Sequence, residues 1–352
     1  MTRREFWQGC QVGATYIGTV VGAGFASGQE IYQFFGRYGN WGYAGVLLSL
    51  TLFYYLGLRL LTLGHRLRAQ SYREMNEFLF GAKVGRIVDF ALLIMLFGVI
   101  VAMLAGAGEL FKERLHLSFQ IGVLITAIVT YFTVIRGMSG VLRANLVIVP
   151  VMVTFVMLTF VQALLHHGWA TAWQNGYRLA PAHPVAAGLS ALVYVAFNVG
   201  LATGVLVPLG HSIPSPAALR FGAKIGAVGL GGMLLAVVFT LFSYSPAALQ
   251  FSLPMAYVAT KLGTHLQWGF VLVLWAEIFS TLVGNVYALG TQWTSTSVFA
   301  HRLYPAMLLA VAYAGSQIGF APMVKYAYTV FGLACVLIVL ALLWPREQLP
   351  EL

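Results

Sequence analysis

Ten apolar stretches of roughly bilayer-spanning length recur along the chain and constrain its fold more than any other feature. They cover residues 7–35, 41–63, 87–111, 117–135, 141–165, 185–209, 221–242, 266–291, 303–318 and 323–344. A helix needs about 20 apolar residues to cross the hydrocarbon core, and only 9% of the residues are charged, against about 25% in soluble domains. We therefore expect an all-α polytopic membrane protein with ten transmembrane helices.

The basic residues set the orientation of these helices. The chain has 20 Lys and Arg against 10 Asp and Glu, an excess that in a membrane protein marks cytoplasmic loops rather than a nucleic-acid surface. If the N-terminus lies inside, 14 of the 20 fall in cytoplasmic segments. An even number of spans returns the C-terminus to the same side. We expect a protein of the cell (inner or plasma) membrane with both termini cytoplasmic.

The first stretch contains a glycine cluster that interrupts its helical pattern. Gly22, Gly24 and Gly28 lie within seven residues, next to Ser27 and followed by Glu30. Glycine costs about 1 kcal/mol in a helix interior, and unwound backbone survives at membrane depth only where it is buried in protein or lines a cavity. We expect non-helical backbone within this cluster and a binding site beside it. The alternative is a glycine-rich packing face with a polar helix end.

The two halves of the chain have matching interruptions. Residues 16–26 align with residues 194–204, which pairs Gly22 with Gly200. Each segment begins a set of five spans, and because five is odd, the second set must be inverted in the membrane. Interrupted helices at matching positions of inverted halves mark the binding site of many transporters. We expect a first repeat at 1–165 with a broken helix at 7–35, a second at 166–344 with a broken helix at 185–209 and an outer hairpin of short helices at 243–263, and a cytoplasmic tail at 345–352.

The eighth stretch carries a polar stripe on one helical face. Its members follow the spacing i, i+3, i+4, i+7 and i+8: Glu277, Ser280, Thr281, Gly284 and Asn285. Hydroxyl groups beside free carbonyls can coordinate a small hard cation, and the alternative is hydrogen bonding between helices or back to the same helix. Acidic residues at membrane depth are functional candidates. Glu277 is the deepest, whereas Glu30 stands where the first helix resumes and could instead favour that helix N-terminus.

The string GTVVGAGFASGQEI, residues 18–31, closely resembles the first span of YkvI-like membrane proteins. These proteins are similar to small members of the amino acid–polyamine–organocation superfamily, which has the LeuT-type fold. The resemblance covers the whole chain. It implies a 5+5 inverted repeat with spans one and six broken and a serine–threonine pair in span eight.

The resemblance also implies where ligands bind. Na⁺ would bind the carbonyls of Gly18 and Val21 and the hydroxyls of Ser280 and Thr281. The substrate carboxylate would meet the freed amides at the helix break, with Phe197 closing over the substrate. The implied substrate-binding residues are Gly22, Ala23, Gly24, Ser27, Phe197, Asn198 and Gly200.

Two features depart from the family pattern. Phe25 and Ala26 stand where many such transporters have an asparagine that binds a second sodium, which argues against a second ion here. Glu277 is unusual within the stripe. It could carry a coupling proton or balance a cationic substrate, and Glu30 is the other coupling or charge-balancing candidate.

We therefore expect a secondary active transporter that moves an amino acid or related small amine by cation symport. Na⁺ is the expected coupling ion, with H⁺ coupling through Glu277 or a non-transporting, ligand-sensing receptor of the same fold as alternatives. Cys10 and Cys335 form no metal-binding or disulfide pattern, and no nucleophile–base pair is apparent. We expect no enzyme activity, no cofactor and no nucleic-acid partner; the partners are a small-molecule substrate and the lipid bilayer.

Overall fold

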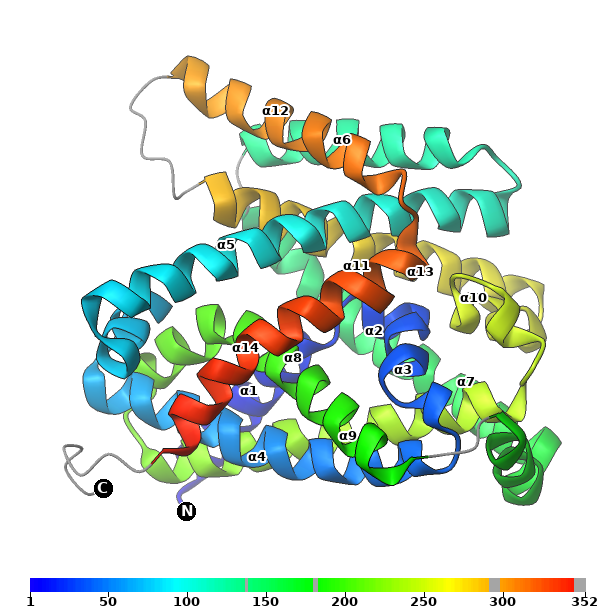
Figure 1. Ribbon diagram of the computed structural model, residues 1–352, viewed down its shortest axis with the longest axis horizontal. Helices are drawn as coiled ribbons and strands as arrows, with labels where there is room; N and C mark the ends of the chain where they lie inside the picture. Colours follow the sequence, from blue (N-terminus) through cyan, green and yellow to red (C-terminus); the bar gives the residue numbers. More distant parts are fainter. Residues whose placement is uncertain (137–138, 180–182, 291–297, 345–352) are drawn as a thin grey trace.

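The computed structural model describes residues 1–136, 139–179, 183–290 and 298–344, so the expected tail at 345–352 lies outside the described residues. Regular structure in these ranges is entirely helical, without a β-strand. The elements in chain order (Figure 1) are α1 (Arg3–Val20), α2 (Ala23–Ser27), α3 (Gln29–Phe34), η1 (Gly36–Tyr38), α4 (Trp41–Leu67), α5 (Tyr72–Leu115), α6 (Phe119–Arg136), α7 (Ser139–Leu179), α8 (Pro184–Ser212), α9 (Pro216–Ser243), η2 (Ala248–Gln250), α10 (Pro254–Ala259), η3 (Thr260–Leu262), α11 (Thr264–Gly290), α12 (Val298–Ser316), α13 (Phe320–Pro322), the π-helix η4 (Met323–Tyr328) and α14 (Thr329–Leu343).

Eight helical segments in the described part of the chain are long and apolar enough to cross a membrane. They are α4, α5, α6, Val147–Leu179 of α7, α8, α9, α11 and Phe320–Leu343. These segments correspond to the second to eighth and the tenth of the predicted stretches. The prediction of a polytopic helical membrane protein is therefore confirmed.

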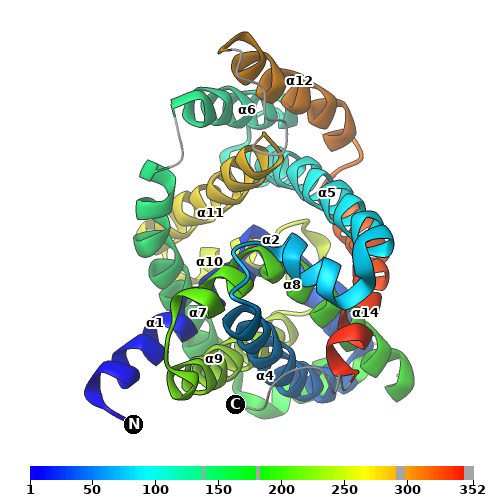
Figure 2. The ribbon, with the colours of Figure 1, turned by 90° about the vertical axis from the view of Figure 1, so that its left-hand side faces the viewer.

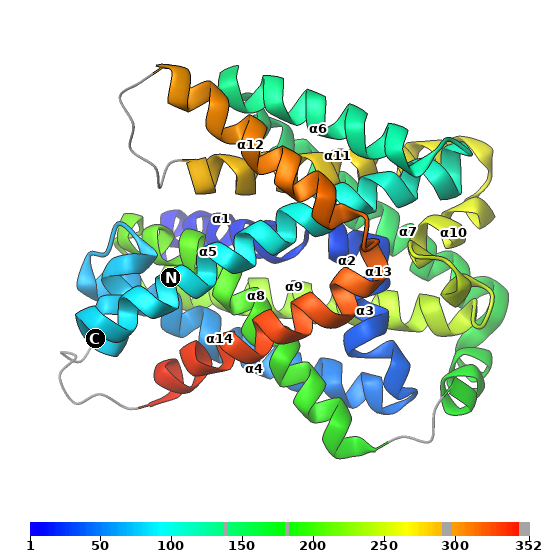
Figure 3. The ribbon, with the colours of Figure 1, turned by 45° about the horizontal axis from the view of Figure 1, so that its top comes forward.

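Helices α1, α4, α8 and α9 pack against one another and form one layer of the molecule. Helices α5, α6, α11 and α12 form a second layer, in which α6 and α12 lie farthest from α4 and α9 (Figures 2 and 3). Helix α7 packs on both α9 and α11, and α14 packs on α8, so these two helices join the layers. The short helices α2 and α3 lie where the layers meet: α2 contacts α11, and α3 contacts α8 and α9.

Glycines let α4 and α8 approach to backbone contact. A Cβ on Gly64 would collide with the carbonyl oxygen of Val207, and a Cβ on Gly210 would collide with that of Leu61. Small residues at such positions allow close packing in a membrane, where no hydrophobic effect drives helices together. At the same end of the pair, the ring nitrogen Nδ1 of His65 lies 3.0 Å from the carbonyl oxygen of Ile213.

Helices α1 and α8 run in opposite directions. The Ser215 hydroxyl, just after α8, donates to Glu5 Oε1 at the start of α1 over 2.8 Å, so α8 ends where α1 begins. Thr2 caps α1 and donates its amide to Glu5 Oε2. The hydrogen bonds from Thr2 and Ser215 lower the pKa of Glu5. The antiparallel course of α1 and α8 is the one expected for the first helices of two inverted halves.

The predicted break in the sixth span, at residues 198–204 of the broken helix 185–209, is wrong. Helix α8 is continuous from Pro184 to Ser212. The polar side chains that indicated a break bond within the helix: Asn198 Nδ2 donates to the Tyr194 carbonyl over 2.9 Å, and Thr203 Oγ1 to the Gly200 carbonyl over 2.7 Å. A continuous helix satisfies its own backbone groups, which hydrocarbon cannot do.

Two connections expected on the outer side are more helical than the sequence indicated. Helix α7 continues to Leu179 after a sharp bend at Gly168, where φ is +70°. The expected hairpin at 243–263 does contain short helices, η2, α10 and η3. However, Met255 and Ala256 of α10 are fully buried, and α10 packs on α2, α9 and α11. Helix α10 is therefore part of the core, whereas η3 has no buried residue and lies at the surface.

Candidate functional site

The first span is interrupted where the glycine cluster predicted. Helix α1 ends at Val20, Val21 and Gly22 have extended backbone, and α2 begins at Ala23. A second interruption follows at Gly28, whose φ of +79° favours glycine. The last carbonyls of a helix and the first amides of the next have no partner within their own helices. The carbonyl of Gly18 and the amides at the start of α2 are in these positions.

The polar stripe of α11 meets this interruption. A Cβ on Gly22 would lie 3.5 Å from Thr281 Oγ1, which places the threonine hydroxyl directly beside the break. Ser280 is buried, and its hydroxyl donates to the Glu277 carbonyl over 3.2 Å. The structure thus places Thr281, one member of the predicted cation site (Gly18, Val21, Ser280 and Thr281), beside Gly22. Its hydroxyl oxygen is a type of ligand that a hard cation prefers.

Glu277 lies one turn from Thr281, and its Oε1 atom is buried without a hydrogen-bond partner among the described residues. Its side chain is 2% exposed, and Oε1 makes no hydrogen bond to any described residue. The ion pair between Lys112 Nζ and Glu109 Oε2, at 4.0 Å, does not involve Glu277. An unpaired ionised carboxylate is costly in a low-dielectric interior, so a proton or a bound cation would stabilise this group.

Glu30 is the second buried acidic residue. It lies in the first turn of α3 and is 5% exposed. The turn at Gly28 brings its carboxyl group back over α2, so that a Cβ on Gly24 would collide with Glu30 Oε2. The Asn198 side chain of α8 lies beside the same carboxyl group. Glu30 therefore lies between α2 and α8, and it also occupies its expected position at a helix N-terminus.

Two of the candidate substrate residues lie elsewhere. The Ser27 hydroxyl donates to the Gly24 carbonyl over 2.8 Å and accepts from the Gln29 amide over 3.3 Å, so it holds the turn between α2 and α3. Gly200 faces Cys335 of α14, whose Sγ a Cβ at this position would meet. These contacts orient Ser27 and Gly200 toward other residues and not toward the break between Val20 and Ala23.

Of the remaining candidates on α8, Asn198 lies beside Glu30, and Phe197 directly precedes Asn198 in the chain. Phe197 is buried and stacks on Tyr328 of η4, with ring centroids 4.5 Å apart. Tyr194 lies one turn earlier, fully buried, and its hydroxyl has no hydrogen-bond partner among the described residues. Sequence reasoning did not place Tyr194 or Tyr328 at the site. An aromatic pair, Tyr326 and Tyr328, at the start of an apolar span was the available signal.

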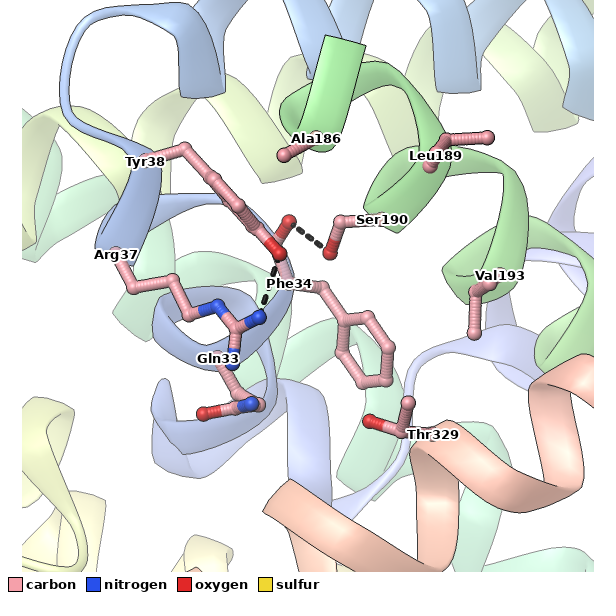
Figure 4. A pocket seen from close by; sticks show the side chains of 9 residues that line it. All are labelled: Gln33, Phe34, Arg37, Tyr38, Ala186, Leu189, Ser190, Val193 and Thr329. Carbon is pink, nitrogen blue, oxygen red and sulfur yellow. Dashed lines mark hydrogen bonds between the residues drawn. The ribbon is translucent and has the colours of Figure 1, made fainter. Parts of the chain in front are cut away.

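A cavity of about 240 Å³ lies between α3, η1, α8 and the start of α14 (Figure 4). It is lined by Gln33, Phe34, Arg37, Tyr38, Ala186, Leu189, Ser190, Val193 and Thr329. Gln33 follows Glu30 by one helical turn, and Thr329 directly follows Tyr328. Phe34 packs on Tyr194 with ring centroids 5.4 Å apart. Phe34 thus contacts both the cavity and Tyr194.

The chain resembles bacterial membrane proteins over nearly its whole length. It is 36% identical over 333 residues to an uncharacterized membrane protein, YkvI, of Bacillus subtilis (strain 168), covering 95% of this chain and 94% of the relative. It is 25% identical over 337 residues to the uncharacterized protein YyaD of the same organism, with 94% of each chain covered. No protein-family model matches the chain.

The fold is that of transporters with the LeuT fold. A manganese transporter mutant of Eremococcus coleocola superposes with a TM-score of 0.65 and 13% identity, covering 97% of this chain and 80% of that one. MhsT in complex with L-phenylalanine gives 0.64 and 17% identity, covering 96% and 88%. A Na⁺-coupled sialic acid symporter gives 0.64 and 12% identity, covering 96% and 79%. These neighbours are membrane transporters and not enzymes.

Proposed function

Because the chain belongs to the same family as the Bacillus subtilis membrane protein YkvI, and because its fold is that of LeuT-type transporters, we propose that it is a secondary active transporter. It would have ten spans, with α1–α3 as the first and α12 as the ninth, arranged as two inverted sets of five. Its cargo would be an amino acid or related small amine, moved by cation symport.

The observation that carries this proposal is the contact between the interrupted first span and α11. Gly22 lies against Thr281 Oγ1, and Glu277 lies one turn away with an unpaired, buried oxygen. Free helix ends, hydroxyl groups and an uncompensated carboxylate in one place are unfavourable without a ligand. A helix bundle held together only by packing would not need them.

Na⁺ is the coupling ion that we propose. It would bind the carbonyls of Gly18 and Val21 and the hydroxyls of Ser280 and Thr281. Glu277 would lower the cost of bringing the ion into the membrane. One of the neighbours is a Na⁺-coupled symporter, while another is a manganese transporter, so the fold alone does not specify the ion.

Proton coupling through Glu277 is the second candidate. Its support is the Oε1 atom that is buried without a partner. A carboxyl group in such surroundings gains stability by taking up a proton. In this mechanism Glu277 would bind the proton on one side of the membrane and release it on the other.

Movement would follow the two layers of the fold. The bundle of α1, α4, α8 and α9 would rock against α5, α6, α11 and α12, exposing the site alternately to either side. Because Gly18 of α1 and Thr281 of α11 belong to different layers, the ion would hold the layers together when it is bound. Ion binding would in this way be coupled to the movement of the layers that carries the substrate across the membrane.

Proteoliposomes test the proposal. Purified protein is reconstituted and supplied with radiolabelled amino acids and amines under an inward Na⁺ gradient, an inward H⁺ gradient or no gradient. Substrate accumulation is expected under the Na⁺ gradient, and not under the H⁺ gradient or without a gradient. Accumulation that follows only the H⁺ gradient would support the second candidate. Ligand binding in detergent without uptake under any gradient would identify a receptor and refute transport.

A further inference from the structure

The Glu30 carboxyl group occupies the place where a substrate carboxylate was expected. The resemblance to amino acid transporters assigned that carboxylate to the freed amides at Ala23 and Gly24. In the structure, however, a Cβ on Gly24 would collide with Glu30 Oε2 and lie 3.3 Å from Glu30 Cδ. A substrate carboxylate bound at Gly24 would therefore lie next to the Glu30 carboxylate, and two carboxylates so close together in a buried site repel strongly. A substrate with its own carboxylate would therefore meet an opposing charge.

The surroundings of Glu30 offer aromatic faces and neutral polar groups. The Phe197 and Tyr328 rings stack at 4.5 Å with an angle of 26° between them. The Tyr194 side chain is fully buried, and its hydroxyl is unpartnered among the described residues. It lies within electrostatic reach of both Glu30 and Asn198. Rings around a carboxylate are the surroundings that an ammonium group prefers.

Buried positive charge is absent near this site. Among the described residues, Arg114 is the basic side chain that is buried, and it lies at the outer end of α5 with its guanidinium 4.9 Å from the centre of the Phe251 ring. Glu30 and Glu277 therefore have no buried basic partner in the described interior. The interior can accept positive charge beyond that of one coupling ion.

A divalent metal fits these residues poorly. No group of three or more His, Cys, Asp or Glu side chains suited to a metal ion occurs in the part of the chain that the structure describes. Transition metals take several nitrogen, oxygen or sulfur ligands, whereas one carboxylate among aromatic rings suits an organic cation.

Resting on the transport function proposed above, we propose that the substrate is a small organic amine cation without a carboxylate group. Its ammonium group pairs with Glu30, its apolar part lies against Phe197 and Tyr328, and the Tyr194 hydroxyl accepts a hydrogen bond from the ammonium group. The substrate class follows from one residue, Glu30, because its carboxylate supplies the charge that an amino acid would bring itself.

Matched ligand pairs test this inference. The purified full-length protein is titrated with 2-phenylethylamine and L-phenylalanine, 3-methylbutylamine and L-leucine, and cadaverine and L-lysine, which differ within each pair by one carboxylate. Binding raises the melting temperature by mass action. At least one amine is expected to bind about tenfold more tightly than its parent amino acid, the size of effect that about 1.4 kcal/mol gives. Amino acids binding as tightly as their amines, Mn²⁺ stabilising alone, or no amine binding at all would overturn the inference.

A variant and a control assign the effect to Glu30. Glu30→Gln keeps the size of the side chain and should lose at least tenfold in amine affinity while amino acid affinity stays equal or rises. Glu109→Gln removes a carboxylate that pairs with Lys112 outside the site and should bind amines like the parent protein. Uptake assays separate the two proposals. Accumulation of amino acids but not of amines would refute the amine substrate class and support transport. Amine binding without uptake would support the amine class of ligand and refute transport.

Discussion

Thr281 and Glu277 are the residues whose surroundings depart most from ordinary helix packing. Most hydroxyls on the membrane helices bond to their own helix, as Thr154 Oγ1 does to the Pro150 carbonyl over 2.9 Å. Thr281 instead points at the break beside Gly22. Glu277 is buried, and its Oε1 has no partner among the described residues. These differences make both residues suitable for testing one at a time.

Replacing Thr281 with Ala is expected to weaken Na⁺-dependent stabilisation and uptake about tenfold, because a contact to a charged group contributes about 1.5–3 kcal/mol. The folded fraction should not change, since the hydroxyl is half-buried and not part of the apolar core. Melting temperature against Na⁺ concentration measures the effect. Thr154→Ala is the matched control and should leave the Na⁺ dependence intact. Equal Na⁺ curves for the two variants would refute the cation site.

Replacing Glu277 with Gln is expected to keep the fold, because the amide retains the volume and removes a buried charge that lacks a partner. If the carboxylate couples transport to an ion, gradient-driven accumulation should be lost while exchange of substrate across the membrane continues. Melting temperature, exchange and accumulation are measured on one preparation. A lower melting temperature with unchanged transport per folded molecule would instead mean that Glu277 only holds helices together.

At the scale of elements, the break in the first span could be predicted from the sequence, whereas the second predicted break does not exist because α8 is continuous. The unwinding before and after α2 follows from three glycines close together, which is a local property. In α8, Gly200 packs against Cys335 of a helix 135 positions later in the sequence. Whether a glycine unwinds a helix or packs it depends on such remote neighbours, and for the same reason the sequence did not reveal that Glu30 reaches Gly24.

The turn between α2 and α3 should depend on glycine at position 28. Gly28→Ala would force a left-handed residue, at a cost of about 1–2 kcal/mol, and would bring its Cβ to 2.6 Å from Met255 Cγ. Substitution is expected to lower the melting temperature and to impair ligand binding together. Gly204→Ala is the control: this residue lies in α8 with nothing within 4 Å of its Cβ. If Gly204→Ala impaired transport as strongly, α8 would have to unwind during the cycle.

At the scale of the molecule, the bias of basic residues predicts which end faces the cytoplasm. The start of α1 and the end of α14 lie at the same end of the molecule in Figure 1, opposite the short helix α10. This agrees with an even number of spans between them. The proposed substrate class, unlike the expected topology, could not be derived from hydropathy, because the proposal depends on how Glu30, Phe197 and Tyr328 are arranged in space.

Thiol labelling in intact cells tests the orientation. In a background with Cys10 and Cys335 replaced by Ala, Lys261→Cys at the outer hairpin should react with a membrane-impermeant maleimide, because Lys261 is exposed. Arg4→Cys, exposed at the start of α1, should react only after the membrane is permeabilised. The reverse pattern would place both termini outside.

The backbone contact between α4 and α8 limits where water can enter. With Gly64 against Val207 and Gly210 against Leu61, no side chain separates the two helices there, and a water molecule has no room between them. Water stays excluded from this contact between α4 and α8 in any state that keeps these glycines together. The backbone amides of this part of α4 and α8 should therefore be among the slowest to exchange with deuterium. The cytoplasmic opening of the proposed transport pathway would have to form along another face of the bundle.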